Sequence, residues 1–276
     1  AWGGMGVVSF FLTEPATTEI YTLSLRDALL ISREGVDVVI VSRTMSDLEA
    51  SAREIEDETG TRVIPMVLDV TQTDRVNSVI PEAAQQLGGL HILVNSGSAP
   101  GGSASAVGPI ETVNEDDLMS DFDVKYVGAL RCARASIPLM KEQGYGRIIN
   151  ISGGNARNAG NLSGGARNVS MVHLTKTLST QVGRFGITVN CIHPGTTRTE
   201  RTPELIEARA AQLGIDIDQV EATDFAPGAA RGNAICRMVD AAEIAYLTVF
   251  LASDKAWAVT GELIAANGGV GNAVYY

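Results

Sequence analysis

The chain has 276 residues, 45% of them hydrophobic, and a mean hydropathy of +0.11, which predict a single domain with a substantial core. Its net charge of −11 argues against a nucleic-acid partner, because phosphate binding needs clustered lysines and arginines. The three cysteines lack C-x-x-C spacing and the three histidines lack ligand spacing, so we expect no bound metal. No apolar run is long enough to cross a bilayer, so we expect no membrane partner and a cytoplasmic location.

Short apolar runs rich in β-branched residues recur along the chain and predict buried strands. They are VVSFF, VDVVIVSR, RVIPMVLDV, HILVNSGSAP, RIINIS and ITVNCIHPG. Helical spacing of apolar residues separates them, most clearly in DLMSDFDVKYVGALRCARASIPLM (117–140) and VSMVHLTKTLSTQV (169–182). This alternation predicts an α/β fold with a doubly wound parallel sheet, a Rossmann-type three-layer αβα sandwich.

The C-terminal third begins with an irregular stretch. From about 200 to 237 the sequence loses its periodicity and is rich in Ala, Glu and Asp. The following run, DAAEIAYLTVFLASDKAWAVTGELIAANGG, predicts a helix, a turn and a last strand. No linker composition or repeat divides the chain, so we expect one domain over residues 1–276.

Five segments, in this order and at these separations, resemble the short-chain dehydrogenase/reductase family. They are LVN at 93–95, HLTKTLS at 173–179, HPG at 193–195, FLASD at 250–254 and NGG at 267–269. The resemblance covers about residues 33–276. It implies an NAD(P)-dependent oxidoreductase that interconverts a carbonyl and an alcohol on a small or acyl-type substrate, a homo-oligomer (dimer or tetramer), and a substrate lid at about 200–237.

The chain departs from this family at its catalytic pair. The family carries Tyr-x-x-x-Lys early in the helix after RIINIS, and the alignment puts Gly164 and Asn168 at those two positions. No other Tyr-x-x-x-Lys occurs in the sequence. Two further hypotheses therefore stand beside the oxidoreductase: a catalytically silent nucleotide-binding or scaffold protein on the same fold, and a non-redox lyase.

Lys125 occupies the position of an Asn that the family places on the preceding helix. We expect Lys125 and Asn168 to approximate the family's electrostatics beside the nicotinamide ribose; the alternative is that Lys125 is an exposed helix residue. Ser152, or Gly153 after it, takes the family's Ser position. The candidate proton donors are Ser152, His193 and water, since Tyr126 should point about 100° away from Lys125 around the helix.

The resemblance also implies which residues bind the cofactor. Arg43 ends the second strand, where an Arg pairs with a 2′-phosphate, so NADP is favoured and NAD is the alternative. Asp69 would reach the adenine amino group. The complete predicted cofactor set is Arg43, Asp69, Val70, Asn95, Ser96, Gly97, Pro194, Gly195 and Thr197.

The N-terminal segment, residues 1–32, differs from the family. Gly3, Gly4 and Gly6 precede the candidate strand VVSFF, so they cannot form a phosphate-binding turn after it. Residues 16–31, ATTEIYTLSLRDALLI, match the conceptual translation of a sequencing-adapter oligonucleotide, ATTEIYTLSLHDALPI, except at Arg26 and Leu30. We hypothesise an assembly artefact that replaced the first strand and the phosphate loop; the alternative is a naturally diverged helix.

Overall fold

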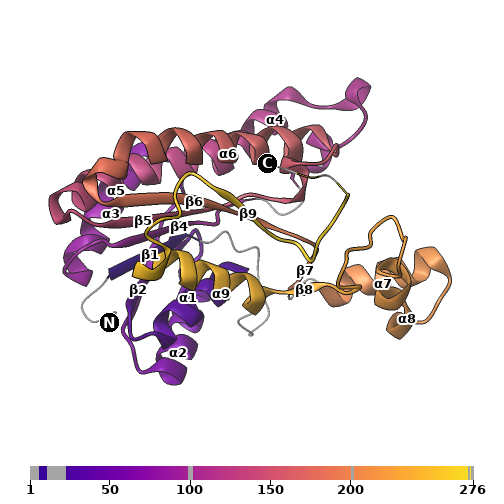
Figure 1. Cartoon of the computed structure of the whole chain (residues 1–276), viewed down its shortest axis with the longest axis horizontal. Coiled ribbons are helices and arrows are strands. Elements are labelled where there is room, and N and C mark those ends of the chain that lie inside the picture. The colour runs from indigo at the N-terminus through magenta and orange to yellow at the C-terminus, as the bar shows by residue number, and fades with distance from the viewer. Residues whose placement is uncertain (1–5, 11–22, 99–101, 200–201, 273, 275–276) are drawn as a thin grey trace.

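A computed structural model describes residues 6–10, 23–98, 102–199, 202–272 and 274 of the chain. Seven parallel strands form the main sheet in the order β3-β2-β1-β4-β5-β6-β9 (Figure 1). They are β1 (Gly6–Phe10), β2 (Asp37–Ser42), β3 (Val63–Val67), β4 (Ile92–Asn95), β5 (Gly146–Ile151), β6 (Ile187–Pro194) and β9 (Leu263–Ala266). The predicted parallel, doubly wound sheet is confirmed.

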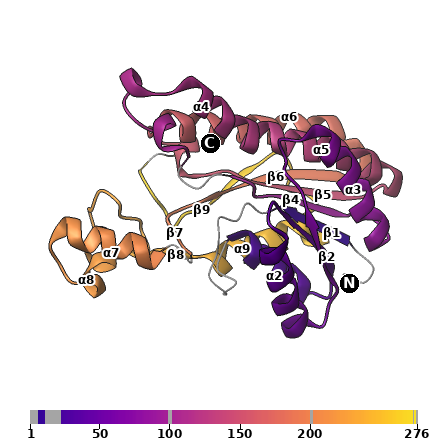
Figure 2. The same cartoon turned by 180° about the vertical axis from the view of Figure 1, so that it is seen from behind.

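Helices cover both faces of this sheet (Figures 1 and 2). One apolar cluster joins the sheet to α1 (Leu23–Arg33), α2 (Met45–Thr59) and α9 (Ala241–Ala252). A second cluster joins the opposite face to α3 (Thr73–Leu87), α5 (Gly128–Gln143) and α6 (Leu162–Val182). The layers are therefore helix, sheet and helix, as the alternating pattern predicts.

The N-terminal strand lies at the centre of the sheet. Val7 is paired with Val38 of β2 on one side and with Ile92 of β4 on the other. His91 fixes the start of this strand, because its Nδ1 accepts a hydrogen bond of 3.0 Å from Gly6 N. The position of a first strand is thus filled by Gly6–Phe10; Gly3, Gly4 and residues 11–22, where a phosphate loop would lie, fall outside the described residues.

The helix predicted over 117–140 contains a turn that the sequence pattern did not predict. It consists of α4 (Glu115–Phe122), the π-helical turn η3 (Asp123–Val127) and α5. A π-helical turn adds one residue to the helix and changes the direction of the side chains around it. In this chain the turn includes Lys125.

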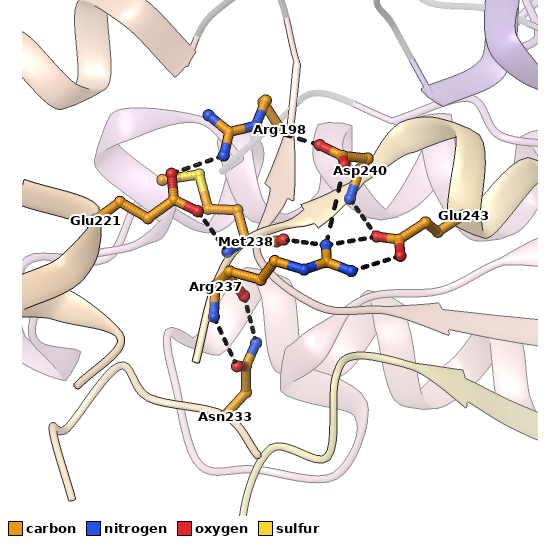
Figure 3. A network of polar contacts seen from close by, with 7 residues as sticks. All are labelled: Arg198, Glu221, Asn233, Arg237, Met238, Asp240 and Glu243. Atoms are coloured by element: carbon orange, nitrogen blue, oxygen red, sulfur yellow. Dashed lines mark hydrogen bonds and ion pairs between the residues drawn. The ribbon is translucent and has the colours of Figure 1, made fainter. Parts of the chain in front are cut away.

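The stretch predicted as a lid forms two helices, α7 (Thr202–Leu213) and α8 (Ile217–Asp224), which project from the sheet in Figure 1. A two-stranded parallel ribbon, β7 (Thr197–Arg198) with β8 (Val239–Asp240), lies at their base. Figure 3 shows ion pairs at this base: Arg198 with Glu221 and Asp240, and Arg237 with Glu243. The short helices are η1 (Ala104–Ala106), η2 (Ile110–Thr112), η4 (Gly154–Ala156), η5 (Gly183–Phe185) and η6 (Asp254–Ala256).

Candidate active site

The predicted cofactor residues all lie at one edge of the sheet. The strands are parallel, so their carboxyl ends share that edge, and ligands of doubly wound sheets bind there. The strand order reverses between β1 and β4, which places residues 96–98 at the switch point. The residues concerned are Arg43 after β2, Asp69 and Val70 after β3, Asn95, Ser96 and Gly97 at β4, and Pro194, Gly195 and Thr197 at β6.

Hydrogen bonds hold several of these turns in place. The Oδ1 atom of Asp69 accepts bonds from Thr71 N (2.9 Å) and Thr71 Oγ1 (2.7 Å). The amide of Asn95 is buried and donates to Asn150 Oδ1 at 2.9 Å, so it ties β4 to β5. Asn95 is thereby already bonded within the core, whereas Arg43 is exposed to solvent at the sheet edge.

The turn after β6 approaches the last strand closely. A Cβ atom on Gly195 would lie 2.8 Å from the Cα of Asn267, so only glycine fits there. Thr197 Oγ1 donates to Gly195 O at 2.9 Å and closes the turn. This edge therefore offers a guanidinium after β2, a carboxylate after β3 and small residues after β4 and β6, a combination that fits a nicotinamide dinucleotide.

Lys125 is buried, with only 7% of its surface exposed, and so is not the exposed helix residue of the alternative interpretation. Its Nζ donates a hydrogen bond of 3.1 Å to the carbonyl oxygen of Ser152, just beyond β5. The π-helical turn places this ammonium at the carboxyl edge of the sheet, close to Asn95 and Gly97, which line the same small cavity.

Ser152 links Lys125 to Asn168. The Ser152 hydroxyl donates to the carbonyl oxygen of Asn168 at 3.0 Å. Gly153 instead faces the Asn168 side chain, because a Cβ there would lie 2.6 Å from its Nδ2. The structure therefore brings Lys125, Ser152 and Asn168 together. The Ser152 proton, however, is already donated to backbone, and Gly153 has no hydroxyl to offer.

Gly164 lies in the first turn of α6 and supplies only backbone. Its N–H donates to the side chain of Asn161 at 2.5 Å, which caps the helix. Four residues later, Asn168 is on the same side of the helix and is almost fully buried, and its Oδ1 has no hydrogen-bond partner. Neither residue carries an acidic proton.

Burial lowers the pKa of Lys125 to about 7. Removal of the ammonium from water is the largest cause, and the nearby positive charge of Arg167 lowers the pKa further. Cys191 on β6 opposes the shift weakly, and burial raises the pKa of its own thiol to about 11. Lys125 can therefore exchange a proton near neutral pH, which the sequence did not predict.

Arg167 is a functional candidate that sequence reasoning missed. It is only 5% exposed, and its Nη1 lies 3.7 Å from Oδ2 of the buried Asp121. Its position could have indicated its importance, because it directly precedes Asn168 and lies three residues after Gly164, on neighbouring positions of α6.

His193, the other side chain proposed as a proton donor, is less well placed. His193 is 1% exposed, its Nδ1 has no hydrogen-bond partner, and burial followed by the charge of Arg157 lowers its pKa below the ordinary value. The neutral form therefore predominates at pH 7. Tyr126 packs against Phe122, with ring centroids 4.9 Å apart.

Within the described residues, no group of histidine, cysteine, aspartate or glutamate side chains could hold a metal ion. In the same part of the chain, no helix is both long and apolar enough to cross a membrane.

The sheet order, the switch point and the polar turns at the carboxyl edge define a doubly wound nucleotide-binding protein. The family model described as Enoyl-(Acyl carrier protein) reductase matches residues 25–271. The chain belongs to the short-chain dehydrogenase/reductase family. Residues 1–24 lie outside that match.

Two curated reductases are similar to most of the chain. Short-chain reductase protein NovJ of Streptomyces niveus is 32% identical over 240 residues, 87% of this chain and 86% of NovJ. NADPH-dependent reductase BacG of Bacillus subtilis (strain 168) is 28% identical over 245 residues, 88% of this chain and 91% of BacG. These relatives support oxidoreductase chemistry with a nicotinamide cofactor.

A solved structure is similar in fold over almost the whole chain. L-Sorbose reductase from Gluconobacter frateurii, complexed with NADPH and L-sorbose, superposes with a TM-score of 0.83 at 25% identity. The match covers 98% of this chain and 97% of the reductase.

Proposed function

We propose that the protein is an NADPH-dependent reductase that interconverts a carbonyl and an alcohol on a small or acyl-type substrate. The observation that carries this proposal is the buried Lys125, whose Nζ is bonded to Ser152 O beside Asn168 at the carboxyl edge of the sheet. NovJ and BacG, both named as reductases, support the reaction class.

The cofactor preference rests on Arg43. This side chain is exposed immediately after β2, at the position where a carboxylate would favour NAD. A guanidinium forms strong charge-assisted hydrogen bonds with phosphate, whereas a carboxylate would bond a ribose hydroxyl. BacG, which carries NADPH in its name, and the NADPH complex of L-sorbose reductase are consistent with this choice.

The chain's own residues would hold the cofactor and manage one proton. Arg43 would pair with the 2′-phosphate, Asp69 would contact the adenine, and Pro194, Gly195 and Thr197 would line the nicotinamide. Reduced nicotinamide, when bound, supplies a hydride to the carbonyl carbon. The carbonyl π-electrons then move to oxygen, which must take up one proton.

Lys125 is the group we assign as the proton donor. Its Nζ–H bond breaks, the proton forms an O–H bond with the substrate oxygen, and the neutral amine recovers a proton from water. A pKa of about 7 suits general acid catalysis at neutral pH, because a useful fraction of the ammonium is present and releases its proton readily. Ser152 O holds the ammonium in place through the 3.1 Å hydrogen bond.

The second candidate function is a silent nucleotide-binding or scaffold protein. The observation that favours it is the absence of hydroxyl groups at Gly153 and Gly164 and of an ammonium at Asn168. This hypothesis predicts that the carboxyl edge of the sheet binds a nucleotide and that the protein converts no substrate.

Fluorescence titration with NADPH, followed by a panel of ketones, aldehydes and acyl thioesters monitored by NADPH oxidation, tests the proposal. We expect saturable binding and oxidation with at least one carbonyl class. Binding without oxidation by any compound would contradict the reductase and favour the silent protein. A lack of NADPH binding would contradict both.

We also infer a cytoplasmic homo-oligomer. Three large side chains on α9 and just after it are well exposed for their type: Tyr246 (61%), Phe250 (43%) and Trp257 (53%). Tyr246 and Phe250 lie one turn apart on the same side of α9, and such exposed apolar side chains favour an interface. Light scattering of the purified protein should give the mass of a dimer or tetramer, and a monomer at micromolar concentration would contradict this inference.

A further inference from the structure

Two cations are buried side by side in this otherwise acidic chain. Lys125 and Arg167 are 7% and 5% exposed, and the charge of Arg167 lies close enough to affect Lys125. Hydrogen bonds join their surroundings, since Lys125 Nζ bonds Ser152 O and Ser152 Oγ bonds Asn168 O, next to Arg167. The repulsion between them favours the neutral form of Lys125, whereas Arg167 stays charged and requires an anionic partner.

Asp121 provides one negative charge, but its hydrogen bonds are made to other groups. Its carboxylate accepts from Ser163 Oγ (2.5 Å), Ser103 Oγ (2.8 Å) and Ser103 N (3.0 Å). Arg167 approaches it only to 3.7 Å, beyond hydrogen-bond distance. Despite burial, the bonds from Ser163 and Ser103 and the charge of Arg167 keep the pKa of Asp121 below its usual value, so it stays ionised.

Arg167 consequently lacks the partners that a buried guanidinium needs. Its Nε and Nη1 are both buried without a hydrogen-bond partner. Unpaired buried donors of a charged group are costly, because the hydrogen bonds that water would have made are lost. An anion bound beside Arg167 would supply the hydrogen bonds that its Nε and Nη1 lack.

The surroundings also favour an anion. Arg167 lies in the second turn of the 21-residue helix α6, whose N-terminal end carries positive partial charge. Gly164, three residues earlier on α6, adds no side chain beside Arg167. Gly102 packs closely against both members of the ion pair, since a Cβ there would lie 2.7 Å from Asp121 Oδ2 and 3.2 Å from Arg167 Nη2.

We propose that Arg167 forms a carboxylate-binding subsite near Lys125, and that the substrate is therefore an oxo acid rather than a neutral ketone. This proposal rests on the proposed reductase function. Arg167 binds the carboxylate of the substrate, and Lys125 is left to face the carbonyl oxygen. The substrate class is thereby defined by its charge, and neutral esters or amides of the same compounds bind poorly.

Turnover of a matched pair of substrates tests the proposal. Acetoacetate and methyl acetoacetate share the ketone, and only the first carries a carboxylate. We expect kcat/KM for the acid to exceed that for the ester at least tenfold, the gain typical of one or two charge-assisted hydrogen bonds. Arg167→Met should bring the acid-to-ester ratio of kcat/KM close to one, mainly by raising KM for the acid, and any change in ester turnover reports the loss of the Arg167 charge near Lys125. Arg134→Met, the same replacement at an exposed position of α5, is the control.

A binding measurement separates this proposal from the reductase. Malonate is a dicarboxylate that cannot be reduced, and its binding to the full chain is measured by calorimetry against sodium chloride at equal ionic strength. Saturable binding that is lost in Arg167→Met and kept in Arg134→Met supports the subsite, even if no carbonyl is turned over. Binding that is equal in both variants, or absent from the unmodified protein, overturns it.

Asp121→Asn is expected to strengthen malonate binding, which is the opposite of the effect expected for Arg167→Met. Simple misfolding could therefore not explain both results. This change removes the competing negative charge and keeps an acceptor for Ser103 and Ser163. We expect malonate to bind about threefold to tenfold more tightly, because the charge of Asp121 no longer competes with malonate for Arg167. We also expect a larger acid-to-ester ratio. Weaker malonate binding in a folded Asp121→Asn variant, judged by circular dichroism, would overturn the subsite.

Discussion

Asp27 and Lys125 are buried ionisable side chains in two different regions, and their surroundings give them opposite consequences. Asp27 of α1 is fully buried where this helix packs against α9, and neither carboxylate oxygen has a hydrogen bond of normal geometry. Lys125 lies at the carboxyl edge of the sheet and has a defined acceptor in Ser152 O. Burial is the largest cause of both shifts, and it brings both pKa values to about 7.

The comparison shows that a shifted pKa becomes useful only where a substrate can exchange the proton. Around Asp27, only the Thr248 hydroxyl offsets the burial, and only in part, so the carboxylate destabilises the α1–α9 contact at neutral pH. Lys125 instead lines a small cavity at the carboxyl edge of the sheet together with Val70 after β3 and with Asn95 and Gly97 at β4. We therefore expect substitutions of Lys125 to alter activity and substitutions of Asp27 to alter stability.

Lys125→Met should have the largest effect. Removing the proposed proton donor is expected to lower kcat by about 10²- to 10⁴-fold, the usual contribution of general acid catalysis. In the unmodified enzyme, carbonyl reduction should decline as pH rises through about 7, because the acid form is then lost. The reverse oxidation should rise over the same range. Steady-state kinetics from pH 5 to 9 measure both.

A second readout makes this prediction independent of turnover. The folded protein binds fewer protons at Lys125 than the unfolded chain between pH 7 and about 10, so the free energy of unfolding contributed by this group rises with pH there. Lys125→Met should lack that rise. Unchanged kcat in the variant would eliminate Lys125 as the donor.

Asp27→Asn should have the next largest effect. We expect it to change the free energy of unfolding and to leave catalytic activity unchanged. The folded-state pKa is raised from 3.8 to about 7, so this group stabilises the fold below pH 4 and loses that contribution as pH rises to 7. The variant should therefore gain up to about 4 kcal/mol relative to the unmodified protein between pH 4 and pH 7. Urea unfolding at several pH values measures the difference.

The matched control for this change is Asp57→Asn, the same replacement at an exposed position of α2. The Asp57 side chain is exposed, so this variant measures what the Asp-to-Asn replacement does outside the core, and its effect is subtracted at each pH. A flat difference between Asp27→Asn and the unmodified protein over the same pH range would contradict the buried-carboxylate account.

The position of Asp27 within residues 16–31 connects this comparison to the origin of the N-terminal segment. If an assembly artefact supplied these residues, a buried carboxylate without a proper partner is what a segment not selected for this core would leave. Sequencing of source DNA across codons 16–31 tests the artefact hypothesis. We expect the source DNA to encode a different sequence in this region. Recovery of the same codons without interruption would refute the artefact hypothesis.

The fold was predictable because its signals are local and repeated. The strands β2 to β6 are apolar β-branched runs, and β9 lies within the run predicted as the last strand. The positions of Lys125, Ser152 and Asn168 were predictable from the family order of motifs. Their energetics were not, because the burial of Lys125 and the charge of Arg167 beside it arise from a π-helical turn and from packing between distant segments.

Arg43→Gln should have a smaller effect, on cofactor binding. Unlike Asp27 and Lys125, Arg43 is exposed, so its charge remains in water until a ligand binds. Loss of the charge-assisted hydrogen bonds to a 2′-phosphate is expected to weaken NADPH binding about tenfold to a hundredfold and to leave NADH binding unchanged. Fluorescence titration with both cofactors checks this, and equal losses for NADPH and NADH would contradict the NADP preference.

Arg237→Met should have the smallest effect on the free energy of unfolding, because it removes an exposed ion pair and not a buried charge. Arg237 is 44% exposed and pairs with Glu243, which is 41% exposed, at 2.7 Å (Figure 3). The pKa of Glu243 is lowered to about 2, with the Arg237 hydrogen bond as the largest cause. Solvent and salt screen such a pair, so we expect only a small loss in the free energy of unfolding at pH 7, which disappears as pH falls through about 4 to 2 and shrinks in about 0.5 M salt. A loss well above this at high salt would mean that the base of the lid, and not only the buried charges, determines stability.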